Sequence, residues 1–356
     1  MKILVLSRYN SLGASSRYRI FQFLPYFEQK GWEIKIHCLL NHNYISYLYQ
    51  KTKLPIFEIL ISYLKRIHYL LKKSEYDVVW LQQEAFPWIP TWLEKLFLKQ
   101  GKIIIVDFDD AFFYRYEGHS SKIIRFLLGK KIDKIMQLAD VVVVGNQYLA
   151  ERALLNNTQK IVIIPTVVDI NRYHLKKNYS KKKFTVGWIG SPHNAKYLNS
   201  IKNVIRIMIR EHDIRFIAVG SGILDFVEDN IIIREWSENS EIENILSFDV
   251  GIMPLIDSIW ERGKCGFKLI QYMACGIPVV ASPVGMNSQI VKHGENGFLA
   301  KNEGEWIKYL LKLKNAREIR EKFGISGRKI VEEEYSLQVI APKVLRLFRD
   351  TLQAKS

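Results

Sequence analysis

The stretch from residue 261 to residue 285 holds the residues whose types and spacing best suit a chemical role. It reads ERGKCGFKLIQYMACGIPVVASPVG and follows an apolar run, FDVGIMP at 248–254, that predicts a strand. A helix is predicted to begin near Phe267 and to end at Gly276, because glycine commonly follows the last helical turn. The loop therefore joins the carboxyl end of a strand to a helix start, which is where open α/β sheets bind ligands.

Positive charge gathers on this loop. The backbone N–H groups around Gly266 and Lys268 are expected at the helix start, where the helix dipole favours an anion. Arg262 and Lys264 add fixed positive charge beside them. We therefore predict a diphosphate site, in which Lys268 and Arg262 act as catalytic residues that stabilise the charge of a departing diphosphate.

Short apolar runs alternate with amphipathic stretches along the whole chain, which favours α/β architecture with parallel sheets. Near-continuous Val and Ile runs are typical of strands that are covered on both faces. Such runs are found at 2–7, 33–39, 77–82, 102–108, 140–145, 160–166, 183–190, 214–220, 231–235, 248–254, 277–282 and 297–300. The spacing of apolar residues predicts helices over 17–30 and 123–138.

The alternation breaks once, at residues 168–183. This segment, VDINRYHLKKNYSKKK, has no apolar period and is rich in Lys and Asn, so we predict a linker there. The prediction is two Rossmann-like domains, 1–167 and 184–335, facing each other across a cleft. Residues 336–356 are predicted to form a C-terminal helix that packs back across both halves.

Bulk properties limit the class of protein. The 356 residues suffice for two domains, and no apolar run reaches the roughly 18 residues that a membrane span needs. Cys38, Cys265 and Cys275 are scattered without metal-ligand spacing, as expected of reduced thiols in a cytoplasmic protein. The net charge of +16 indicates an anionic partner, which could be a nucleic acid, an anionic lipid or a phosphorylated small molecule.

Residues 261–285 resemble the donor-binding signature of the retaining glycosyltransferases of family four, the group 1 glycosyltransferases, which have the GT-B fold. The family helix reads roughly LEAMACGTPVVAS, and LIQYMACGIPVVAS stands here at 269–282. GWIGSPHNAKYL at 187–198 and VGSG at 219–222 are similar to the family's other donor loops. The resemblance, closest to bacterial surface-polysaccharide enzymes, implies a nucleoside diphosphate sugar as co-substrate, retention of configuration, and neither a cofactor nor a metal ion.

The family usually carries two glutamates eight positions apart, where this chain has Gly263 and Gln271. By resemblance the second position binds the ribose, which Gln271 can still do as a neutral amide. Glu261 is the nearest replacement for the sugar contact. The donor-binding residues implied by the resemblance are Gly190, Ser191, Lys196, Gly220, Glu261, Lys264, Gly266, Phe267 and Gln271.

Two loops of the first half could serve the acceptor or the donor phosphates. SRYNSLGASSRYR at 7–19, with Gly13, Ser16 and Arg17, resembles the family's N-terminal phosphate or acceptor loop, and an ordinary capped helix is the alternative. In DFDD at 107–110, catalytic Asp109 or Asp110 could orient or activate an acceptor hydroxyl. Capping of the next helix is the alternative role.

DFDD also matches the Asp-x-Asp metal motif of GT-A, the other major glycosyltransferase fold. The predicted donor motif lies in the opposite domain, so a metal ion at DFDD would be misplaced, and we predict no metal site.

The segment from Tyr44 to Leu98 mixes aromatic residues with Lys and Arg on amphipathic stretches. Trp88 and Trp92 stand beside prolines in it. Such a face could rest on anionic lipid at the inner face of the cell membrane and bring the enzyme to a lipid-linked acceptor. The alternative is a set of helices packed on the sheet, with their lysines in water.

We predict a metal-independent hexosyltransferase that moves a sugar from a nucleoside diphosphate sugar to a glycan or lipid-linked acceptor, in surface polysaccharide or glycoconjugate synthesis. A non-catalytic nucleotide-sugar-binding protein would account for the missing glutamates. A basic nucleic-acid-binding protein would account for the charge, but the sequence contains no recognisable module of that kind, so no nucleic acid is expected as a partner.

Overall fold

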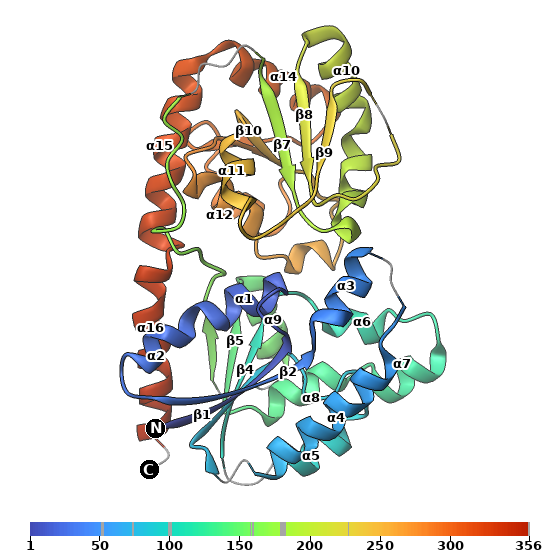
Figure 1. Ribbon diagram of the computed structural model, residues 1–356, viewed down its shortest axis with the longest axis vertical. Coiled ribbons are helices and arrows are strands. Elements are labelled where there is room, and N and C mark those ends of the chain that lie inside the picture. The colour runs from blue at the N-terminus through green and yellow to red at the C-terminus, as the bar shows by residue number, and fades with distance from the viewer. Residues whose placement is uncertain are drawn as a thin grey trace. The chain divides into compact units, whose positions relative to one another are not determined.

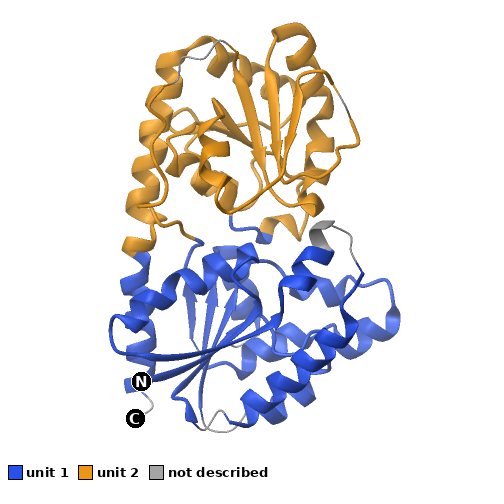
Figure 2. Cartoon of the chain, viewed as in Figure 1, with its two compact units in different colours: residues 1–166, 263–265, 340–356 blue, residues 167–262, 266–339 orange. Residues whose placement is uncertain are grey.

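The computed structural model describes residues 1–50, 53–72, 75–98, 102–156, 158, 160–178, 183–226 and 228–354, the side chains of residues 48–50 excepted. The chain forms two compact units (Figure 2). Unit 1 comprises residues 1–166, 263–265 and 340–356, and unit 2 comprises residues 167–262 and 266–339. The predicted linker, residues 168–183, falls within the range of unit 2, and its residues 179–182 lie outside the described residues.

Unit 1 is built on a parallel sheet of six strands in the order β2-β1-β3-β4-β5-β6. The strands are β1 Lys2–Tyr9, β2 Glu33–Leu40, β3 Val78–Gln82, β4 Ile103–Phe108, β5 Val141–Val144 and β6 Ile161–Ile163. All residues of β3, β4 and β5 are buried, as their unbroken apolar runs predict.

Helices cover both faces of this sheet (Figure 1). They are α1 Ala14–Arg19, the 3₁₀ helix η1 Phe21–Phe23, α2 Leu24–Glu28, α3 His42–Gln50, α4 Ile56–Leu71, α5 Thr91–Leu98, α6 Phe113–Glu117, α7 Lys122–Leu128, α8 Lys131–Leu138 and α9 Gln147–Leu155. Leu70 of α4 and Leu98 of α5 pack with Val79 and Leu81 on one face. Phe27 of α2 contacts Trp80 on the other face, because successive strand residues point to opposite sides.

The last helix, α16 Leu337–Gln353, starts in unit 2, and its residues from Ile340 onward belong to unit 1. Phe348 packs its ring edge-on to Phe27 and Trp80, with centroid distances of 5.0 Å in both cases. The C-terminal helix is thereby part of the core of unit 1.

Unit 2 repeats the architecture with a parallel sheet in the order β12-β11-β10-β7-β8-β9. Its strands are β7 Thr185–Ile189, β8 Arg215–Val219, β9 Ile231–Arg234, β10 Val250–Met253, β11 Val279–Ala281 and β12 Gly297–Leu299. Its helices are η3 Pro192–Ile201, α10 Lys202–His212, α11 Glu241–Leu246, η4 Glu261–Gly263, α12 Phe267–Ala274, α13 Asn287–Ile290, α14 Glu303–Asn315 and α15 Arg317–Glu334. Two apolar clusters, one on each face, enclose the sheet.

The predicted α/β fold with two parallel sheets is confirmed, and each predicted strand is present. The two stretches predicted as helices are helical for most of their length, but each is divided into shorter helices. Residues 17–30 form three short pieces, because Pro25 has no N–H to continue a helix and instead stands at the start of α2. Residues 123–138 form α7 and α8, separated by Gly129 and by Lys130, whose backbone leaves the helical region.

Candidate functional site

The loops of interest in unit 2 follow two neighbouring strands. β7 lies between β8 and β10, so the chain leaves β7 toward one side of the sheet and reaches β10 on the other side. This reversal of strand order is the topological switch point at which open α/β sheets bind ligands. The loop of residues 254–266 follows β10 and ends at α12, where the sequence predicts it.

Lys268 stands in the first turn of α12, and its side chain extends over the carboxyl end of β7. The Nζ atom lies 4.1 Å from the centroid of the Trp188 ring, a close cation–π contact. A Cβ atom added to Gly190 would lie only 2.7 Å from that Nζ atom. The absence of a side chain at residue 190 therefore makes room for the ammonium group at the switch point.

Gly190 and Gly220 bring two loop backbones close together. Gly220 has φ +72°, and a Cβ atom there would lie 2.4 Å from the carbonyl oxygen of Gly190. The Gly190 N–H donates to the Val219 carbonyl at 3.0 Å. The two loops leave the sheet side by side, which brings Gly190, Gly220 and Lys268 into one site.

The start of α12 is shaped by Gly266. This residue is the N-cap with φ +66°, and a Cβ atom on it would lie 2.4 Å from Ile290 Cδ1. Gly266 has no side chain, so the N-cap residue itself provides no side-chain hydrogen bond to the first turn of α12. Phe267 follows and is half-buried.

Glu261 is buried, and both carboxylate oxygens have partners. The Tyr197 hydroxyl donates to Oε1 at 2.5 Å, and Ser258 donates to Oε2. Arg262 is exposed and forms a two-point contact with Asp257, at 2.7 Å from Nε and 3.1 Å from the terminal nitrogen. The hydrogen bond from Arg262 holds the pKa of Asp257 below its usual value.

Three other predicted donor residues are less closely tied to this site. Ser191 is the N-cap of η3, and its hydroxyl accepts a hydrogen bond from the Asn194 amide at 3.2 Å. Lys196 is exposed and lies over the Tyr197 ring, 5.2 Å from its centroid. Lys264 belongs to the short segment 263–265 that groups with unit 1.

Gln271 is almost fully buried and takes part in a chain of hydrogen bonds. Its amide donates to the Tyr173 hydroxyl at 2.9 Å, and that hydroxyl donates to Glu241 Oε1 at 3.0 Å. The Trp236 ring N–H donates to the other oxygen of Glu241 at 2.8 Å. The amide nitrogen of Gln271 thus has a partner within the protein, and its ribose contact stays a prediction.

In unit 1 the predicted loop after β1 is well fixed. A Cβ atom on Gly13 would lie 2.4 Å from Tyr9 Cβ, so the turn requires glycine. The Ser16 hydroxyl accepts from the Tyr9 N–H at 3.0 Å and donates to Gln82 at 2.6 Å. Arg17 is buried, with its guanidinium 4.8 Å from the centroid of the Tyr18 ring. Ser16 therefore ties the loop to the end of β3.

Asp109 and Asp110 follow β4 and are half-buried. Asp109 Oδ1 accepts from the Gln83 amide at 3.1 Å, and Ser15 donates to Oδ2. Asp107, two residues before Asp109, is buried in a two-point ion pair with Arg19, with both distances 2.8 Å. Asp109 thus joins the ends of β3 and β4 to α1.

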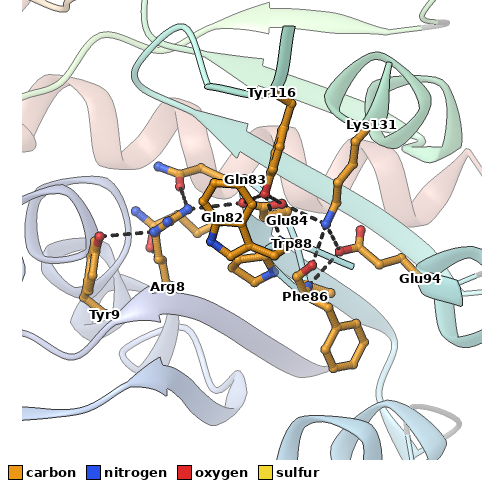
Figure 3. Close-up of polar contacts among 12 residues, drawn as sticks. Arg8, Tyr9, Gln82, Gln83, Glu84, Phe86, Trp88, Glu94, Tyr116 and Lys131 are labelled. Atoms are coloured by element: carbon orange, nitrogen blue, oxygen red, sulfur yellow. Dashed lines mark hydrogen bonds and ion pairs between the residues drawn. The ribbon is translucent and has the colours of Figure 1, made fainter. Parts of the chain in front are cut away.

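Four further polar residues at this edge were not predicted as site residues (Figure 3). They are Gln82, the last residue of β3, Gln83 and Glu84, which follow it, and Arg8 of β1. Arg8 donates to Gln83 at 3.0 Å and to Glu84 at 3.3 Å. The signal was present, because QQE directly follows the apolar run DVVWL and so falls at the carboxyl edge of the sheet. These side chains line the same edge as Asp109.

Glu84 is held by a buried network. Lys131 of α8 lies 2.9 Å from Glu84 Oε2 and 3.0 Å from Glu94 Oε1, and the Tyr116 hydroxyl donates to Glu84 at 2.7 Å (Figure 3). Burial alone would raise the pKa of Glu84, but Lys131 and Arg8 outweigh it and hold that pKa below its usual value. Burial raises the pKa of Glu94 to about 7, against the opposing charge of Lys131.

The loop held by this network has an unusual backbone. Gln83 and Trp88 have φ +64° and +66°, a region that costs a residue other than glycine of order 1–3 kcal/mol. Such strain persists where the surroundings fix it and is often found at functional sites. Trp88 is exposed, and Arg115 lies over its ring at 4.8 Å from the centroid. The network thus presents a tryptophan and an arginine at the surface.

Comparison with known sequences places a family match in unit 2. Residues 183–315 match the model of the family described as glycosyl transferases group 1. The chain is 25% identical to an uncharacterised glycosyltransferase of Methanocaldococcus jannaschii over 95% of this chain and 91% of that protein. It is 22% identical to N-acetyl-alpha-D-glucosaminyl L-malate synthase of Bacillus anthracis over 56% of this chain and 58% of that protein.

Two solved structures share the fold over almost the full length. The sucrose-phosphate synthase of Thermosynechococcus elongatus has a TM-score of 0.74 at 13% identity, covering 99% of this chain and 100% of that one. HepE of Anabaena, in complex with UDP-glucose, has a TM-score of 0.75 at 16% identity, covering 98% and 100%. These likenesses show that the chain shares the fold of the two solved structures, and the group 1 glycosyltransferase match covers residues 183–315.

Proposed function

We propose that the protein transfers a hexosyl group from a nucleoside diphosphate sugar to an acceptor hydroxyl with retention of configuration, as a family-four enzyme. The observation that carries this proposal is the placement of the Lys268 ammonium at the switch point, over Trp188 and beside Gly190. The complex of HepE with UDP-glucose supports a nucleotide sugar as donor.

In unit 2 the donor diphosphate would lie at the start of α12. Lys268 would neutralise its developing charge, the role that a metal ion has in other enzymes, so the reaction is proposed to need neither a metal ion nor a cofactor. Arg262 would assist after leaving Asp257. We assign backbone contacts to Gly190, Gly220, Gly266 and Phe267, and polar contacts to Ser191, Lys196, Glu261, Lys264 and Gln271.

In unit 1 the polar edge formed by β1, β3 and β4 would bind the acceptor. Asp109 or Asp110 would orient the acceptor hydroxyl or accept its proton. Gln83 fixes one oxygen of Asp109, which makes Gln83 a positioning residue in this scheme. Gly13, Ser16 and Arg17 would border the same place, because Ser16 is bonded to the end of β3.

The cellular setting follows from the acceptor class. We propose a glycan or lipid-linked acceptor in surface polysaccharide or glycoconjugate synthesis, with the enzyme in the cytoplasm and in peripheral contact with the inner face of the cell membrane. No helix among the described residues combines the length and apolar character that crossing a bilayer requires.

One observation favours a second function. Positions 263 and 271 carry Gly and Gln, and the Gln271 amide already donates to Tyr173. A protein that binds nucleotide sugars without transferring them would fit this departure from the family. An assay for slow hydrolysis of the nucleotide sugar without acceptor distinguishes the two functions. Only an enzyme would release free sugar and nucleotide, whereas a binding protein would leave the nucleotide sugar intact.

A thermal-shift series with UDP-, GDP- and other nucleotide sugars tests the donor site. At least one of them should raise the melting temperature of the wild type, by mass action. Lys268→Ala should lose most of that rise, and Lys322→Ala, an exposed lysine on α15, should keep it. The donor site is wrongly assigned if no nucleotide sugar stabilises the wild type, or if Lys268→Ala responds as the wild type does.

A further inference from the structure

Helix α4 carries apolar residues on two opposite faces. One face packs on the sheet of unit 1, with Leu70 in the core and Tyr63 and Ile67 against it. The other face is exposed to solvent, and it includes Phe57 and Leu64 at 74% and 67% exposure. An amphipathic helix of a soluble protein normally places polar residues there.

The neighbouring helix α5 extends this apolar surface. It packs against α4 and exposes Trp92 and Leu96, with Trp92 at 66% exposure. We call the surface the α4–α5 face and define it by Phe57, Leu60, Leu64, Leu71, Trp92 and Leu96. Exposed apolar surfaces of this kind mark sites of interaction with a protein or a membrane.

Exposed lysines flank the apolar side chains of these two helices. Lys65 of α4, Lys72, which directly follows α4, and Lys95 of α5 are exposed. Of the two carboxylates in these helices, Glu94 is buried and Glu58 is half-exposed and bonded to Asn41 and Asn43. The described part of the face therefore combines large apolar side chains with three exposed lysines, against one half-exposed carboxylate, that of Glu58.

We propose that the α4–α5 face docks on the surface of an anionic lipid bilayer. Helices with an apolar face and flanking lysines lie in the interface plane, with apolar side chains below the headgroups and ammonium groups at the lipid phosphates. The α4–α5 face would then be the surface that makes the membrane contact of the proposed function. The inference rests on that proposed function. It requires no membrane-spanning helix.

The lysines argue against a second copy of the chain as the occupant. A symmetric dimer contact buries the same patch of both subunits. Lys65, Lys72 and Lys95 would then approach the same three lysines of the partner, and such like-charge contacts cost several kcal/mol. An anionic lipid surface attracts the same charges.

Vesicle sedimentation tests the proposal with the full chain. Wild-type protein should bind vesicles of phosphatidylcholine and phosphatidylglycerol, bind pure phosphatidylcholine much less, and lose binding at high salt. Leu64→Ser with Trp92→Ser should abolish binding, and Lys65→Glu should weaken it at least about fivefold. The matched controls are Ile325→Ser and Lys322→Glu, which change exposed residues of α15 and should bind as the wild type does.

Two results would overturn the docking site. The first is binding of anionic vesicles that the α4–α5 variants leave unchanged. The second is a wild type that does not bind vesicles. This includes the case in which the wild type is a dimer and Leu64→Ser converts it to a monomer, because the face would then bind a second copy of the chain. Thermal shifts with nucleotide sugars on the same variants keep the two proposals apart. If the α4–α5 variants lose lipid binding but still respond to nucleotide sugars, the docking site is supported. If lipid binding is intact but no nucleotide sugar produces a thermal shift, only the proposed function is contradicted.

Discussion

The Lys131 ammonium lies 2.9 Å from Glu84 Oε2, and both side chains are almost fully removed from solvent. The pair connects α8 to the strained loop after β3, and Glu94 adds a second carboxylate to the same ammonium. Two buried carboxylates depend on one lysine, so this lysine fixes the polar edge at which we place the acceptor.

Replacing Lys131 with Met should destabilise the protein strongly. Removal of one partner of a buried ion pair leaves uncompensated charge and typically costs about 3–5 kcal/mol. Urea unfolding of Lys131→Met measures the loss, and Lys134→Met, an exposed lysine on the same helix, should change the free energy of unfolding by less than about 0.5 kcal/mol. Equal stability of the two variants would contradict a structural role for the pair.

Glu94 should make the stability of the protein depend on pH. Its pKa is about 7 in the folded state and 4.5 in the reference state, so the folded state binds more protons between these values. The contribution to stability is therefore complete below pH 4.5 and is lost as the pH rises through 7. Glu94→Gln should remove this dependence, on the order of 2–3 kcal/mol across the window. Unfolding curves of both proteins from pH 4.5 to 7.5 measure it, and parallel curves would refute the assignment.

Gly190→Ala should weaken donor binding and lower the stability of the fold, because the fully buried Trp188 ring has little room to move. The added methyl group would lie 2.7 Å from Lys268 Nζ and 2.7 Å from the Trp188 ring, and the flexible end of the lysine is the group that can move. We expect roughly a tenfold or greater loss of nucleotide-sugar affinity by calorimetry, the scale of one charge-assisted hydrogen bond. Gly304→Ala, where the nearest atom lies 3.5 Å away, is the control and should bind as the wild type does.

Gln271→Glu, which restores the residue typical of the resembling family, should destabilise this protein. The Tyr173 hydroxyl has a single proton and donates it to Glu241, so a second carboxylate at 271 would lose the hydrogen bond that the amide now donates. We expect a loss of about 1–3 kcal/mol in the free energy of unfolding at neutral pH. A variant of unchanged stability with higher donor affinity would show instead that residue 271 faces the ribose.

The strands were predictable because their chemistry is local. Runs such as VVWL in β3 and VVVV in β5 are apolar without interruption, and only a strand covered on both faces has that environment. The breaks at Pro25 and Gly129 also have local causes, but the apolar spacing continues across them. The spacing of apolar residues shows which side of the chain faces the core. A short turn between two helices can leave the same side facing the core, so the spacing does not reveal the break.

The position of the loop that we propose to bind the donor was predictable, and its internal contacts were not. Gly266 and Lys268 occur where a strand, a loop and a helix follow one another in the sequence. The contact of Lys268 with Trp188 depends on β7 and β10 being neighbours, which is a property of the strand order. The contact of Gln271 with Tyr173 likewise joins residues that are far apart along the chain. The polar end of β3 was missed although its position at the sheet edge was visible.

The packing of Phe348 against Phe27 and Trp80 has a consequence for folding during translation. A ribosome completes Phe27 and Trp80 long before it produces Phe348, which follows them far along the chain. During that interval the nascent chain carries an aromatic surface whose natural cover does not yet exist, a period in which exposed apolar surface invites aggregation. Unit 1 therefore cannot complete its core until α16 has been made, and a ribosome that stalls before α16 leaves behind a first unit with that aromatic surface uncovered.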